Sequence, residues 1–124
     1  MTDSFSIRAR LRSLRYALRG IAEMLRSQHN SRVHLGATLA VLVAGLYFRL
    51  GGVEWCLLIF AMALVWVTEA LNTALELLCD VASPEFHPLV AKCKDVAAAA
   101  VLLSAIAALA VGLVIFIPYL LVGR

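Results

Sequence analysis

The chain has 124 residues, of which 63% are hydrophobic, and its formal net charge is +3. Soluble domains contain about 45–50% apolar residues, and a domain of this size has too little interior to hide the excess. The composition therefore excludes an ordinary water-soluble domain and indicates one small all-α membrane domain. Anionic lipid headgroups account for the positive charge, so we expect no nucleic-acid partner.

Residues 1–31 are predicted to form an amphipathic arm on the membrane surface. Six apolar residues recur at alternating steps of four and three residues, as on one face of a helix: Ile7, Leu11, Leu14, Leu18, Ile21 and Leu25. Arginines follow most of them one residue later, which is typical of a basic surface helix. We expect Thr2, Asp3 or Ser4 to cap its start. The long basic run argues against a signal peptide.

Three segments are predicted to cross the membrane: residues 33–50, 55–79 and 96–122. A transmembrane helix needs about 20 mainly apolar residues, with a usual range of about 17–25, so the first span is short and the second is long. Glycines predict a tight turn over residues 51–54. Two prolines predict a loop over residues 81–94, with no more than one short helical turn.

The basic residues set the expected orientation. Seven arginines precede the first span, and Lys92 and Lys94 lie in the 81–94 loop. The opposite side carries Arg49 and Arg124. By the positive-inside rule, the arm and the loop are cytoplasmic. We therefore expect a multi-pass protein of the cell (inner) membrane, with its N-terminus and its polar site at the cytoplasmic face.

A stripe of polar residues lies on the second span: Glu69, Asn72, Glu76 and Asp80. Their steps of three, four and four residues place them within an arc of about 80° on one helix face. A carboxylate inside a bilayer costs about 3 kcal/mol even on the lenient insertion scale. The stripe therefore indicates a cavity, a polar ligand or a bound ion. Because the span is long, we expect Glu76 and Asp80 at the headgroups and Glu69 deeper.

Other polar residues converge on the same cytoplasmic boundary: Asn30, Arg32, His34, Glu85, His87, Lys94 and Asp95. Phosphoryl transfer needs such a set, because carboxylates hold Mg²⁺, cations neutralise phosphate charge, and a carboxylate accepts the proton of the attacking hydroxyl. The sequence has neither a glycine-rich P-loop nor a soluble-kinase catalytic loop. The residues alone indicate a cytoplasm-facing polar site in a helical bundle, and they leave a kinase and a channel both open.

The spacing of these residues resembles that of the small prokaryotic diacylglycerol kinase family, whose members act on diacylglycerol or on undecaprenol. The resemblance extends over nearly the whole chain. It rests on the polar stripe, on Glu85-Phe86-His87-Pro88, and on Lys94-Asp95 followed by an alanine-rich segment. It implies a surface helix and three transmembrane helices in a homotrimer with active sites shared between subunits. It also implies phosphoryl transfer from MgATP to a membrane lipid alcohol.

The resemblance further implies roles for individual residues. Glu69 is the expected general base at the lipid hydroxyl, and Ala98 is expected to contact the lipid substrate beside it. Glu76 and Gln28 are the expected ligands of Mg²⁺. The nucleotide site is expected to comprise Arg10, Tyr16, Gln28, Asn72, Glu76, Glu85, Phe86, His87, Lys94 and Asp95.

Position 28 departs from the family pattern, which usually has a glutamate there as the second metal ligand. The amide oxygen of Gln28 can ligate Mg²⁺ but brings no charge, so metal binding should be weaker unless His29 or a nearby carboxylate compensates. Glu23 lies about 140° round the helix and is no obvious replacement. The runs Asn72 to Glu76 and His87 to Leu89 favour the undecaprenol branch.

Two other functions stay open at this point. One intramembrane glutamate can serve as a proton and cation site, so a non-enzymatic oligomeric transporter is one alternative, and a weakly active kinase homologue is the other. Arg32 and His34 are interpreted as headgroup anchors rather than ATP contacts. The three cysteines are interpreted as packing residues.

Overall fold

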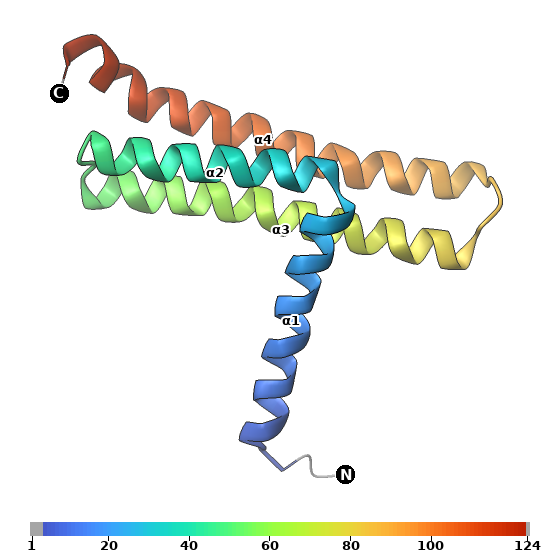
Figure 1. Cartoon of the computed structure of the whole chain (residues 1–124). Helices are drawn as coiled ribbons and strands as arrows, with labels where there is room; N and C mark the ends of the chain where they lie inside the picture. The colour runs from blue at the N-terminus through green and yellow to red at the C-terminus, as the bar shows by residue number, and fades with distance from the viewer. Residues whose placement is uncertain (1–3, 124) are drawn as a thin grey trace.

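The computed structural model describes residues 4–123, which form four helices and no strand (Figure 1). Three helices lie side by side as a bundle, and the N-terminal helix leaves this bundle crosswise. The predicted all-α class is therefore confirmed. The helices are α1 (Ile7–Ser27), α2 (His29–Tyr47), α3 (Gly52–Ala82) and α4 (Pro88–Val122).

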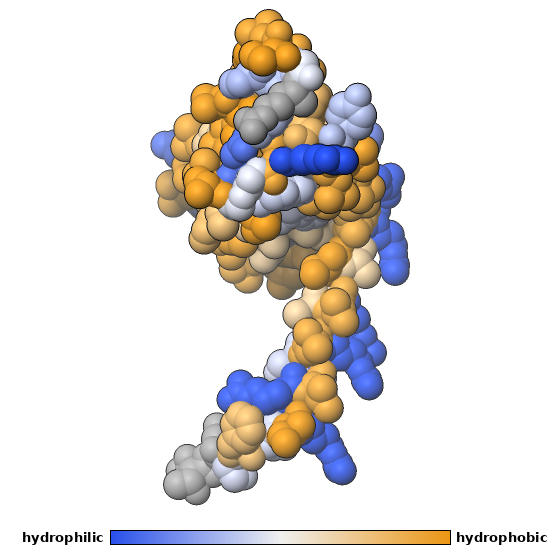
Figure 2. Space-filling model, turned by 90° about the vertical axis from the view of Figure 1, so that its left-hand side faces the viewer, coloured by the Kyte–Doolittle hydropathy of each residue, from blue (hydrophilic) through white to orange (hydrophobic). Residues whose placement is uncertain are grey.

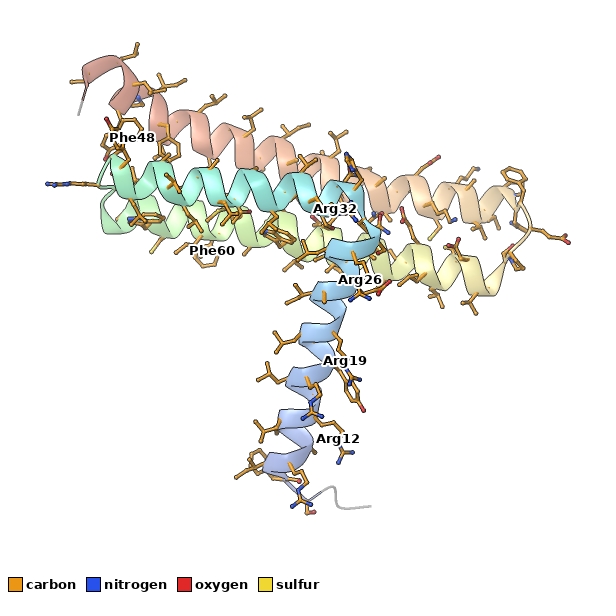
Figure 3. All side chains as sticks on the ribbon, viewed as in Figure 1. Arg12, Arg19, Arg26, Arg32, Phe48 and Phe60 are labelled. Carbon is orange, nitrogen blue, oxygen red and sulfur yellow. The ribbon has the colours of Figure 1, made fainter. Side chains whose placement is uncertain are left out.

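Helix α1 begins at a serine cap and presents two different faces. The cap is Ser6, whose Oγ accepts a hydrogen bond from the Ala9 amide at 3.3 Å, so the prediction of Ser4 was wrong. Thr2 and Asp3 lie outside the described residues. The apolar stripe is exposed along the helix, and arginines project from another side (Figures 2 and 3). An uncovered apolar stripe beside a basic face is the arrangement of a membrane-surface helix.

A one-residue elbow at Gln28 turns the chain from α1 into α2. Its backbone is extended (φ −108°, ψ 117°), and its amide donates to the Met24 carbonyl at 2.9 Å. Arg32, in the first turns of α2, reaches back and donates to the carbonyls of Leu25 (3.0 Å) and Arg26 (2.6 Å). A cation is favourable at a helix C-terminus, where carbonyls lack helical partners. Arg32 therefore braces the elbow, a role that differs from the predicted headgroup anchor.

The connection between α3 and α4 is shorter than predicted. Pro88 occupies the first turn of α4, where its missing N–H costs no hydrogen bond. The Nδ1 atom of His87 accepts from the Leu89 amide at 3.2 Å and caps the helix. The loop therefore covers residues 83–87 rather than 81–94, and Lys94 and Asp95 lie inside α4.

The turn between α2 and α3 also differs from its predicted position. It lies over residues 48–51, since Gly51 caps α3 and the helix includes Val53 and Glu54. The Glu54 carboxylate accepts from the Gly51 amide at 3.2 Å and from the Tyr119 hydroxyl at 2.6 Å. These contacts hold the start of α3 together and join it to the end of α4.

The bundle surface is strongly apolar (Figure 2). Among the described residues, α3 and α4 are long and apolar enough to cross a membrane. The core helix of a soluble protein passes the same test but is mostly buried, whereas only 17% of the apolar window of each helix is buried here. The chain is therefore a membrane protein. Helix α2 is shorter and begins with polar residues, so the predicted span over residues 33–50 stays a prediction.

Candidate functional site

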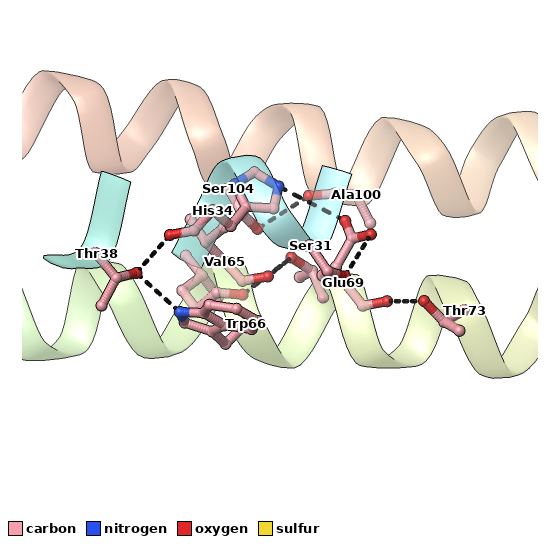
Figure 4. A network of polar contacts seen from close by, with 11 residues as sticks. Ser31, His34, Thr38, Val65, Trp66, Glu69, Thr73, Ala100 and Ser104 are labelled. Atoms are coloured by element: carbon pink, nitrogen blue, oxygen red, sulfur yellow. Dashed lines mark hydrogen bonds and ion pairs between the residues drawn. The ribbon is translucent and has the colours of Figure 1, made fainter. Parts of the chain in front are cut away.

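Glu69 lies deep between the three bundle helices (Figure 4). Its side chain comes from α3, and the residue is only 1% exposed. Two groups from α2 face its carboxylate: the Ser31 hydroxyl lies 3.5 Å from Oε1, and the His34 Nε2 lies 3.6 Å from Oε2. Burying a carboxylate is costly unless polar or charged partners compensate. Burial of the Glu69 carboxylate therefore costs folding free energy. An apolar side chain could fill the same space without that cost, so packing alone does not explain a glutamate here.

The contacts of Glu69 are longer than those of a well-formed hydrogen bond, which span about 2.7–3.2 Å. Within the described part of the chain, Glu69 Oε2 and His34 Nε2 are buried without a hydrogen-bond partner, and so is Asn72 Oδ1. Orphaned buried polar atoms are rare in native proteins. Three of them in one region are suited to binding a polar ligand or sharing a proton.

The His34 ring is held by side chains from two helices (Figure 4). The Trp66 indole N–H donates to Thr38 Oγ1 at 3.0 Å, and the Thr38 hydroxyl donates to the His34 carbonyl at 2.7 Å. The Trp66 ring meets the imidazole edge-on, with centroids 6.4 Å apart. These contacts keep the imidazole at Glu69, whereas sequence reasoning placed it at the headgroups. The i, i+3 spacing of Ser31 and His34 was the only sequence signal for their common face.

The predicted metal ligands do meet at the elbow. Gln28 Nε2 lies 3.5 Å from Glu76 Oε2, and both side chains are half-buried. The oxygen and nitrogen of an amide are interchangeable in assignment, so the pair offers hard oxygen donors. Mg²⁺ commonly takes one or two carboxylates and completes its shell with water and phosphate oxygens, and this donor set fits it. His29, the named candidate to compensate for the missing charge, is exposed, and so is Glu23, which its helix position had already disfavoured.

Two further contacts join α3 to α4 near the hairpin end. Lys94 Nζ lies 2.8 Å from Asp80 Oδ1, and the sulfurs of Cys79 and Cys93 lie 3.9 Å apart. The predicted nucleotide residue Lys94 is therefore paired with the outermost acid of the polar stripe. Its neighbour Asp95 is exposed.

Several predicted site residues are not brought to Glu69 within one chain. Arg10 and Tyr16 lie on α1, away from the bundle, where Arg10 lies over the Phe5 ring at 5.7 Å. Glu85 and Phe86 are exposed in the hairpin connection, and Ala98 is exposed on α4.

An apolar groove of about 420 Å³ leads to this site between α2, α3 and α4. Small residues of α4 leave the space, namely Ala105, Ala108 and Gly112. His34 lines the same groove, so its apolar walls connect directly to the buried polar pair. The arrangement suits a molecule with an apolar chain and a polar end.

Comparison with known proteins gives a consistent answer. Residues 15–116 match the family described as prokaryotic diacylglycerol kinase. An undecaprenol kinase of Bacillus subtilis is 37% identical over 109 residues, which are 88% of this chain and 89% of the relative. A diacylglycerol kinase of Synechocystis is 39% identical over 88% of this chain and 63% of the relative. The diacylglycerol kinase of Escherichia coli K12 is 35% identical over 58% of this chain and 59% of the relative.

Proposed function

The chain belongs to the prokaryotic diacylglycerol kinase family, and from this premise we propose that it phosphorylates a membrane lipid alcohol with ATP as the donor. It is a lipid kinase, and its relatives are named for undecaprenol and for diacylglycerol. The observation that carries the proposal is the burial of Glu69 beside an apolar groove. A base in that position is suited to a hydroxyl carried by a lipid.

Glu69 acts as the general base of this reaction. The lipid chain lies in the groove, and its hydroxyl approaches the free oxygen of the Glu69 carboxylate. The carboxylate takes the hydroxyl proton as the lipid oxygen bonds to the γ-phosphorus. The bond from that phosphorus to the bridging oxygen breaks, and ADP leaves. The apolar walls exclude water, which would otherwise compete as the acceptor.

The nucleotide phosphates bind where the elbow meets α3. Gln28 and Glu76 would hold Mg²⁺ through their oxygens, and the ion when bound supplies positive charge at the phosphates. Lys94 adds a cation further along the hairpin, where Asp80 orients its ammonium at 2.8 Å. Asn72, between the Glu69 and Glu76 levels of α3, offers its unpaired carbonyl oxygen to the same ligands.

We extend the proposal to topology and assembly. Helix α2 is a third span, α1 lies in the cytoplasmic interface of the cell (inner) membrane, and the hairpin connection is cytoplasmic. The active unit is a homotrimer, in which a neighbouring subunit supplies α1 residues such as Arg10 and Tyr16. The crosswise direction of α1 and the distance of these residues from Glu69 within one chain support this arrangement.

The test is phosphoryl transfer by the purified protein in lipid, with γ-labelled ATP and either diacylglycerol or undecaprenol. We expect label in at least one lipid, and no label in either lipid would overturn the proposal. Glu69→Gln should abolish transfer while MgATP binding is retained. Glu23→Gln makes the same chemical change at an exposed position of α1 and should leave transfer unchanged.

Binding of MgATP separates the kinase from a transporter with a buried acid. A ligand at 100 times its Kd stabilises the protein that binds it by about 2.7 kcal/mol. MgATP should therefore raise the thermal unfolding midpoint, whereas Mg²⁺ alone should not raise it to the same extent. An identical midpoint with and without MgATP would favour the transporter.

A further inference from the structure

We propose that His34 is a positioning residue that also relieves Glu69 of the proton taken from the lipid hydroxyl. The inference rests on the proposed kinase function and adds a residue to it. In this role the His34 imidazole acts on Glu69, the general base, and contacts neither the lipid headgroups nor the nucleotide.

The geometry of the two side chains carries the proposal. His34 Nε2 and Glu69 Oε2 lie 3.6 Å apart, both atoms are buried, and neither has a hydrogen-bond partner in the described chain. A charge-assisted N–H···O hydrogen bond is about 2.7–2.9 Å long, so a movement of less than about 1 Å closes the gap. Two orphaned atoms that face each other share a proton at lower cost than either carries it alone.

The surroundings favour exchange within this pair. The α4 residues at this level, Ala100 and Ser104, do not ionise (Figure 4). On α2, the Arg32 guanidinium donates hydrogen bonds to two carbonyls at the end of α1. On α3, the next carboxylate is Glu76, which contacts Gln28 at the elbow. Among residues 4–123, His34 is thus the titratable side chain that faces Glu69.

His34 is more exposed than Glu69, as expected of a residue that carries a proton away from the buried acid. The Glu69 side chain is 1% exposed, while that of His34 is 17% exposed and lines the groove. A buried carboxylic acid cannot readily return its proton to water. The imidazole reaches less buried surroundings, so it can pass the proton on.

The proton balance is as follows. Glu69 takes the hydroxyl proton and becomes a neutral acid while the lipid oxygen bonds to the γ-phosphorus and ADP leaves. The acid then donates this proton to the lone pair of His34 Nε2, which gives a carboxylate and an imidazolium. After the phosphorylated lipid has left the groove, the imidazolium releases one proton to water that enters, and the neutral ring and ionised base are restored for the next turnover.

The test compares His34→Gln with His29→Gln, which makes the same change at an exposed position of α2. Because general acid–base groups contribute about 10²–10⁴-fold, we expect His34→Gln to lower kcat by about tenfold or more with the KM for MgATP unchanged. In His34→Ala, added imidazole should restore part of the lost kcat. A purely structural histidine would not be replaced by free imidazole.

A measurement on the native ring keeps the inference testable if the His34 variants fail to fold. At fixed pH, Glu69→Gln should move the ring ¹⁵N signal of His34 and leave those of His29 and His87 in place. Unchanged kcat in His34→Gln, no rescue by imidazole, or an unmoved His34 signal would each overturn the inference. If the wild-type chain phosphorylates neither lipid, the proposed function fails instead, so the two failures are distinguishable.

Discussion

The Gln28 amide lies 3.5 Å from the Glu76 carboxylate, so the residue that turns α1 into α2 also meets the polar stripe of α3. The fold thereby couples the direction of the arm to the expected metal site. The resemblance predicts a glutamate at position 28, so substitution of Gln28 tests whether this residue takes part in the metal site.

Gln28→Glu should tighten Mg²⁺ binding, because a second carboxylate beside Glu76 adds a charged oxygen ligand. A gain of about tenfold in apparent Mg²⁺ affinity corresponds to about 1.4 kcal/mol. The measurement is the initial rate of lipid phosphorylation against Mg²⁺ concentration at fixed ATP. Gln28→Leu, which removes the oxygen, should shift the curve the opposite way. Curves that coincide for all three chains would remove Gln28 from the metal site.

Gly45→Ala should destabilise the bundle. A Cβ at Gly45 would lie 2.5 Å from the Trp55 ring and 3.2 Å from Leu50, so the ring must move. Overpacking of this kind costs about 1–3 kcal/mol. Gly36→Ala is the matched control, because a Cβ there meets nothing within 4 Å and alanine favours the helix. Denaturant unfolding in detergent would measure both, and equal stability would contradict the close contact of α2 with Trp55.

Mild oxidation with copper–phenanthroline should join Cys79 to Cys93 within one chain. Their sulfurs are 3.9 Å apart, and a disulfide needs about 2.05 Å. Thiol labelling should then detect one free cysteine, Cys56, which lies near the opposite end of α3. Cys93→Ser should keep two free thiols under the same oxidation. Three free thiols in the oxidised wild type would mean that the α3–α4 contact differs from that described.

A cysteine at position 85 should be labelled from the cytoplasmic side. The exposed hairpin connection carries Glu85, and the proposed topology places that connection in the cytoplasm. Glu85→Cys in a chain whose native cysteines are serines should react with an impermeant maleimide in inverted vesicles and stay unreactive in intact cells. The reverse pattern would be incompatible with cytoplasmic MgATP at this site.

The sequence was sufficient to predict the helices, because long apolar runs bounded by prolines and glycines leave few alternatives. Their ends were less predictable. The loop before α4 was placed too long because Pro88 can either break or begin a helix, and the structure uses it to begin one. The elbow at Gln28 has no glycine or proline beside it. It depends on the contacts that Arg32 makes with the end of α1.

The site was predictable on one helix but not between helices. Spacing alone put Glu69, Asn72 and Glu76 on a common face of α3, and burial of Glu69 follows from its depth in the apolar run. Which α2 residues would face it depends on how two helices pack and on their rotation. A local pattern does not contain that information, so His34 was assigned elsewhere.

The elbow has one more consequence. If α1 lies at the level of the headgroups, its contact through Gln28 places Glu76 at the same level. Glu69 precedes Glu76 by seven residues on α3, so the general base lies about 10 Å deeper. The fold itself then fixes the depth of Glu69 below the membrane surface. Substrate selectivity would then depend on the depth at which each lipid places its hydroxyl group in the membrane, as well as on the shape of its tail.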